Sequence, residues 1–131
     1  MRRTASIFGS VMLLAVILPA NADEKFTGTV SDGNNDIPVA LTIATTHQPG
    51  SAAGQIRFED QWKCGFALQF SKTRDKVDIY SLQGAGSGRC VALASGYLHR
   101  GPGAGGSTVI QVFDRLHQAP VYTVDLVPTG K

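Results

Sequence analysis

The chain has 131 residues, which is long enough for one domain with a sizeable hydrophobic core. It carries 12 Lys and Arg against 10 Asp and Glu, a formal net charge of +2, and these charges are scattered along the sequence. Because no block of Lys and Arg occurs, the composition argues against nucleic acid and against an anionic surface as partners.

The first 22 residues have the layout of a secretory signal peptide. Two arginines follow Met1, an apolar run covers 11–18, and a small-residue triplet, Ala-Asn-Ala, ends at Ala22. This order is typical of an exported chain, so we expect cleavage between Ala22 and Asp23. An uncleaved membrane anchor is the alternative, because 4–22 carry no charge, although the strongly apolar part is short for a span.

Cleavage would leave 109 of the 131 residues as a single secreted β domain over 23–131. Two of the 12 basic residues lie in the leader, so the remaining chain has ten basic and ten acidic residues and is close to neutral. We expect this domain in the periplasm or outside the cell, with no membrane span left after cleavage.

The elements expected after the leader are almost all β-strands. Apolar residues alternate with polar or small ones, and along 62–70 this pattern runs through five repeats. Period two is the pattern of a strand with one buried face. In chain order the predicted strands cover 26–30, 37–44, 54–58, 62–70, 77–82, 90–94, 97–100, 108–113 and 121–127.

Turn-forming Gly, Pro, Asn and Asp separate these segments, and no long helix is predicted. One segment, 110–117, fits a short helix as well as a strand followed by a turn, and both possibilities stay open. The fold class that follows is all-β, a small antiparallel β-sandwich or β-barrel of about seven to nine strands with one disulfide.

That disulfide is predicted from the only two cysteines, Cys64 and Cys90. An even pair in an exported chain is typical of a bridge. The bridge would close a loop of 27 residues and stabilise the fold by about 3.5 kcal/mol. A free catalytic cysteine is the alternative, and it would need a histidine beside it.

Several kinds of chemistry find little support in the sequence. The stretch 101–106 contains G-x-G-x-x-G, but a β-branched segment follows where a dinucleotide site needs a helix, so a hairpin loop is expected and no cofactor. His47, His99 and His117 lack zinc-ligand spacing, so no metal is expected. No G-x-S-x-G motif occurs, and the adjacent acids Glu59 and Asp60 fit a solvated hairpin.

The candidate binding residues are Arg89, Tyr97, His99 and Arg100, which lie close to two Gly-rich turns. Tyr and Arg are enriched at binding hot spots, and loops on a rigid sheet commonly carry function. We therefore expect these residues to meet a partner together if the chain folds them onto one rim. Otherwise Tyr97 is half-buried and the arginines only keep an edge strand soluble.

Ser95-Gly96-Tyr97 resembles the Ser-Gly-to-Tyr loop of periplasmic lysozyme inhibitors, and the layout of a small exported β domain with one disulfide is similar to theirs. In those inhibitors the Gly and Tyr are further apart, and their second characteristic segment is missing here. The resemblance implies an inhibitor of an exported enzyme such as a lysozyme.

The function expected from the residues themselves is a small non-catalytic binding module for a protein or cell-envelope ligand. The enzyme inhibitor is the first alternative, and a small secreted hydrolase is the second.

Overall fold

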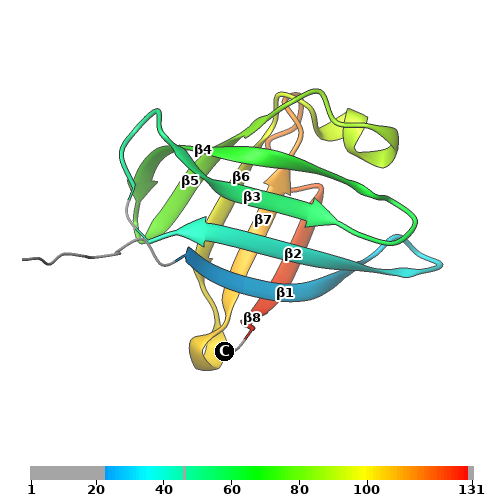
Figure 1. Ribbon diagram of the computed structural model, residues 1–131, viewed down its shortest axis with the longest axis horizontal. Helices are drawn as coiled ribbons and strands as arrows, with labels where there is room; N and C mark the ends of the chain where they lie inside the picture. The colour runs from blue at the N-terminus through cyan, green and yellow to red at the C-terminus, as the bar shows by residue number, and fades with distance from the viewer. Residues whose placement is uncertain (1–22, 46, 130–131) are drawn as a thin grey trace, which may run out of the picture.

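The computed structural model describes residues 23–45 and 47–129, so the predicted leader and its cleavage site before Asp23 lie outside the described part or at its edge. Eight antiparallel strands form a closed barrel in which each strand pairs with the next and β8 returns to β1 (Figure 1). The strands are β1 (Asp23–Ser31), β2 (Asp36–Ala44), β3 (Ala52–Phe58), β4 (Cys64–Arg74), β5 (Val77–Gln83), β6 (Tyr97–Pro102), β7 (Thr108–Phe113) and β8 (Tyr122–Pro128).

This architecture confirms the predicted all-β class with one disulfide, and it resolves the choice between sandwich and barrel in favour of a barrel. The apolar residues that alternate with polar or small ones in the sequence point into the barrel, and the residues between them point outward. In β2, for example, every second residue from Ile37 to Ile43 is buried, whereas the residues between them are half-buried. Inward side chains of all eight strands together fill one continuous hydrophobic core.

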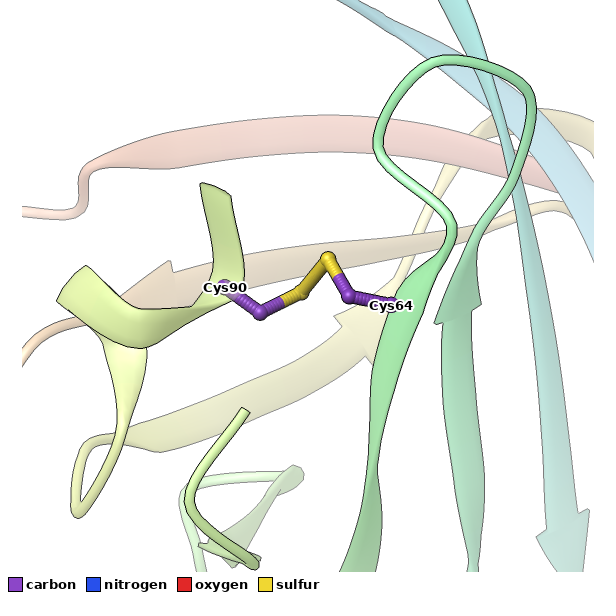
Figure 2. The surroundings of a disulfide bond; sticks show 2 residues. All are labelled: Cys64 and Cys90. Atoms are coloured by element: carbon purple, nitrogen blue, oxygen red, sulfur yellow. A yellow bond between two sulfur atoms is a disulfide. The ribbon is translucent and has the colours of Figure 1, made fainter. Parts of the chain in front are cut away.

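The two ends of the barrel differ. At one end, which we call the loop end, Cys64 at the start of β4 is bonded to Cys90, with their Cα atoms 6.0 Å apart (Figure 2). Trp62 covers the core beside this bridge and contacts the rings of Phe58 and Tyr122, at centroid distances of 5.1 Å and 5.4 Å. The predicted disulfide is therefore confirmed, and it ties a wall strand to the longest connection of the described chain, which joins β5 to β6.

The prediction of a strand over 90–94 is wrong. It lies in a 3-10 helix, η1 (Gly88–Leu93), between β5 and β6. Cys90 and Leu93 are buried while Val91 between them is 58% exposed, a spacing of three that matches the 3-10 period and not the period of two of a strand. The bridge and this apolar contact hold η1 against the barrel without any strand pairing.

The segment 110–117 follows the strand-then-turn alternative. Its first residues belong to β7, which is paired with β6 on one side and β8 on the other. The turn begins at Asp114, whose carboxylate accepts hydrogen bonds from the backbone N–H groups of Leu116 and His117, at 3.0 Å and 2.9 Å. The Gly-rich stretch 101–106 joins β6 to β7 through a single 3-10 turn, η2 (Ala104–Gly106), and so forms the expected hairpin.

The seam between the first and last strands is short. The ladder between β1 and β8 contains only the pairs Phe26–Pro128 and Thr27–Val127. Thr129 extends the contact by donating its backbone N–H to the carbonyl oxygen of Lys25, at 2.9 Å. Neither 3-10 segment of the described chain has the length and hydropathy of a membrane-crossing helix.

Candidate functional site

The end of the barrel away from the disulfide is open, and we call the groove there the mouth. Its volume is about 1020 Å³, and its lining residues come from the starts of β1, β5 and β7, the ends of β6 and β8 and the hairpin between β6 and β7. Phe26, Pro102 and Pro128 supply apolar wall. Charged groups of both signs also line it, namely Asp23, Glu24, Lys25, Lys76, Asp78 and Arg100.

Arg100 is the central charge of the mouth. Its side chain is 18% exposed and reaches across the barrel from β6 to β1. There the guanidinium carbon lies 5.0 Å from the centre of the Phe26 ring, and Nη2 donates to Oε1 of Glu24 at 3.4 Å. Nη1 lies 3.8 Å from Oδ2 of Asp78, its direct cross-strand neighbour. The Nε atom is buried and has no hydrogen-bond partner among residues 23–45 and 47–129.

Asp78 links Arg100 to a second polar group, formed by His47 and Tyr80. The carboxylate of Asp78 accepts a hydrogen bond from the Thr73 hydroxyl at 2.6 Å and lies 3.6 Å from Nε2 of His47. The same Nε2 atom is hydrogen-bonded to the Tyr80 hydroxyl at 3.1 Å, and the His47 ring stacks on Phe70 at 4.6 Å. His47 comes from the loop between β2 and β3, which therefore folds against the barrel interior.

Tyr80 remains a neutral phenol in this setting. Burial raises the pKa of its hydroxyl far above the usual range, and the negative charge of Asp78 raises it further. The side chain is also fully buried. The hydroxyl thus acts as a fixed hydrogen-bonding group for His47, with no access for a substrate.

The inward direction of the mouth charges follows from strand periodicity. Asp78 is in phase with the buried residues Tyr80 and Leu82 of β5, and Arg100 is in phase with Leu98 of β6. A charged residue in phase with the apolar face of a strand must lie in the core or at its end. Arg100 and Asp78 are each close to the terminus of their strand, so both side chains lie at the end of the core and not in its centre.

The structure does not bring the four predicted binding residues onto one rim. Arg100 alone points into the mouth. Arg89 belongs to η1 at the loop end, where its guanidinium carbon lies 5.0 Å from the centre of the Trp62 ring and its Nη1 is 3.9 Å from Asp32. Tyr97 and His99 point outward from β6, because inward positions alternate with them. A binding role for each of the four residues stays a prediction.

Tyr97 and His99 form a cluster with Phe113 on the outer wall of the barrel. The Tyr97 ring stacks on Phe113 at 4.9 Å, and the His99 ring lies 4.6 Å from Phe113. Burial, and to a smaller extent the positive charge of Arg74, lower the pKa of His99. The cluster thus shields an aromatic side chain that strand β7 turns away from the core.

The lowered pKa of His99 predicts a loss of stability in mild acid. The unfolded chain takes up this proton near about pH 6.5, whereas the folded protein takes it up only at lower pH, so the unfolded state binds more protons in between. The free energy of unfolding measured in urea should therefore fall as the pH is lowered from about 7.5 to about 5.5. His99→Gln should show a smaller fall, and an unchanged fall would contradict a lowered pKa.

Of the residues around Arg100, sequence reasoning missed Glu24 and Asp78, which line the mouth, and it did not predict the contact of His47 with Tyr80 beside them. A signal for Glu24 and Asp78 was present in the sequence, because each lies two positions before a buried residue of its strand and therefore points to the inner side of the barrel. His47 carried no such signal, since it lies in a loop and is brought inward by its contacts with Phe70 and Tyr80. Over 23–45 and 47–129, no group of three or more His, Cys, Asp and Glu side chains is arranged to hold a metal ion.

Comparison of the chain with protein-family models, with curated proteins and with solved structures found no match. The resemblance to periplasmic lysozyme inhibitors is therefore limited to Ser95, Gly96 and Tyr97 and to the general layout. Any function has to be inferred from the charges, the apolar wall and the accessibility of the mouth itself.

Proposed function

We propose that the protein is a small non-catalytic binding module, exported through a cleaved signal peptide to the periplasm or the cell exterior, whose mouth holds part of a protein or cell-envelope ligand. The observation that carries this proposal is Arg100, a guanidinium largely removed from water at the base of an open groove. Ligand sites are typically concave and combine apolar wall with polar groups that fix the orientation of the ligand. This groove has apolar wall from Phe26, Pro102 and Pro128, and its six charged side chains favour a ligand that carries charge itself.

The contacts of Arg100 support a role beyond stability. Its distances to Glu24 and Asp78, 3.4 Å and 3.8 Å, exceed the roughly 2.7–2.9 Å of a close charge-assisted hydrogen bond. An arginine offers five donors in a planar fork, and much of this capacity is unused by the protein. A ligand that completed these bonds would gain binding energy without having to desolvate a fully hydrated cation.

The polar group next to Arg100 favours binding over catalysis. His47 presents the same Nε2 atom to Tyr80 and Asp78, while its Nδ1 atom is buried. A general base needs a ring nitrogen within reach of the substrate proton, and neither nitrogen of His47 faces the groove freely. The small secreted hydrolase is accordingly the weakest of the three functions that the sequence suggested.

The loop end favours a second candidate, the inhibitor of an exported enzyme. Three of the large hydrophobic side chains that are exposed in the described chain lie in its loops or at their ends, with exposed fractions of 58% for Val91, 76% for Leu116 and 42% for Val121. These residues belong to the β5–β6 and β7–β8 connections, which lie at the same end of the barrel, and exposed apolar surface is a common feature of protein contacts. In this case the loops would contact the partner enzyme, and the mouth would take no part in binding.

Capture experiments with two variants distinguish the mouth from the outer wall and the loops. The exported protein is immobilised, and its intact mass, expected to equal that of 23–131, checks removal of the leader. Arg100→Gln should reduce capture of the partner from an envelope extract by about tenfold, the effect of losing a hydrogen-bonded charge. Tyr97→Ala tests the outer wall, and if the mouth alone holds the ligand, capture should stay close to that of the original protein.

Thermal unfolding of both variants serves as the control, because a misfolded protein would also lose binding. Capture that is unchanged in Arg100→Gln would contradict the mouth as the site. If Leu116→Ser then abolished capture of an enzyme, the inhibitor would replace the binding module as the function.

A further inference from the structure

The two carboxylates that face Arg100 are held very differently. Asp78 is fixed by the Thr73 hydroxyl, by His47 and by its position opposite Arg100 in the ladder between β5 and β6. Glu24 is 50% exposed, and among the described residues its carboxylate makes a single polar contact, the one to Arg100. Of the two anions, Glu24 is therefore the one that can leave without breaking any other bond.

Glu24 is also the more exposed of the two carboxylates, 50% against 21% for Asp78. Its side chain comes from the second residue of β1, at the start of the described chain, and it lines the groove. Asp78 lines the groove as well, but it is held by Thr73 and His47. A ligand entering the mouth would reach Arg100 at the position that Glu24 now occupies.

We propose that Glu24 is an internal competitor for Arg100 and that the ligand group which replaces it is a singly charged carboxylate. This inference rests on the proposed binding function of the mouth. Exchange of one carboxylate for another keeps the charge around Arg100 constant, and the planar fork of the guanidinium matches a carboxylate in two parallel hydrogen bonds. A doubly charged phosphate would add negative charge close to Asp78, which stays in place.

The walls of the mouth define the remainder of the ligand. Phe26 lies beneath the guanidinium, and Pro102 and Pro128 add apolar surface to the groove. A carboxylate that enters here is therefore expected to carry an apolar body. A small organic acid and the C-terminus of a peptide both supply this chemistry, and they differ in how much of the groove they fill.

Four probes separate these possibilities in an NMR titration of the full exported protein. They are 3-phenylpropionate and its neutral amide, and N-acetyl-trialanine with a free or an amidated C-terminus. Each acid should shift the resonances of Arg100, including its Nε–H, and should bind about tenfold more tightly than its amide. Tighter binding of the peptide acid indicates a peptide ligand, and tighter binding of 3-phenylpropionate indicates a small acid, both consistent with the proposal.

The decisive variant is Glu24→Gln, because it should strengthen binding. Removal of an exposed ion pair of this kind is expected to tighten binding of the acids by about threefold. Arg100→Gln should abolish their binding. The matched control is Glu59→Gln, which removes an acid of similar exposure, 42% against 50%, from a similar pair with Arg57 at 3.5 Å, and it should leave binding unchanged.

The outcomes separate this inference from the proposed function. Equal affinity for acid and amide, or weaker binding by Glu24→Gln, would overturn the carboxylate exchange, and so would failure of both acids to bind Glu24→Gln. If capture of the partner still depended on Arg100 in that case, the mouth would remain the binding site for a different ligand group. If capture did not depend on Arg100, the proposed function itself would fall.

Discussion

Replacing Cys64 and Cys90 together by Ala should lower the free energy of unfolding by about 3.5 kcal/mol. The bridge spans 26 positions of sequence, so its removal lets the unfolded chain explore many more conformations. It also frees η1, whose contacts with the rest of the barrel depend on the buried Cys90 and Leu93. Urea denaturation measures the change, and the melting temperature should fall by roughly 10–20 °C.

Reduction of the unaltered protein is the control for this prediction, because it opens the bridge while keeping both sulfur atoms. A similar loss after reduction and after substitution would assign the effect to the cross-link. A larger loss in the double Ala variant would assign the excess to packing, since Cys64 and Cys90 are both buried. A loss below about 1 kcal/mol in both experiments would show that the bridge adds little to the fold.

The strands of this barrel could largely be predicted because each has one face in the core. Alternation located β2 and β4 clearly, and it predicted the fold class. Closure could not be predicted, since it depends on β1 meeting β8 across the whole length of the chain. Alternation is the same in a sandwich and in a barrel, and only the pairing of the terminal strands distinguishes the two.

Irregular segments escaped prediction for a local reason. The stretch 90–94 contains the β-branched residue Val91 between apolar neighbours, and β-branched residues are enriched in strands. Its burial is set instead by the bond to Cys64 and by the pocket that receives Leu93, and both are tertiary contacts. Tertiary contacts of this kind can hold a segment in a conformation that its own sequence pattern does not predict, here a 3-10 helix in place of a strand.

The candidate site was predicted only in part because residue type was considered without strand phase. Arg100 and His99 are neighbours in sequence, yet they point to opposite sides of the barrel wall. Phase alone would have separated Arg100 from Tyr97 and His99. It would not have revealed that Glu24 reaches Arg100, because β1 and β6 are not neighbours in the sheet and meet only across the mouth.

Gly28→Ala should destabilise the protein by about 3 kcal/mol, at the upper end of the usual cost of overpacking. A Cβ atom at this position would lie 2.4 Å from the carbonyl oxygen of Asp125 and 2.7 Å from Cδ2 of Leu126. The Leu126 side chain can move, but the Asp125 carbonyl belongs to the backbone of β8. The methyl group would therefore push β1 away from β8 beside the two residue pairs that close the barrel.

Gly101→Ala is the matched control, because it adds the same methyl group to another strand glycine. Its Cβ would meet only Cγ2 of Val77, at the ordinary contact distance of 3.6 Å. Stability should then change by no more than about 0.5 kcal/mol, as at most surface positions. Urea denaturation and the hydrogen exchange of the amides of Thr27 and Thr129 measure both variants. Equal stability of the two would show that the seam tolerates wider spacing, and loss of exchange protection only in Gly28→Ala would identify close contact of β1 with β8 as the condition for closure.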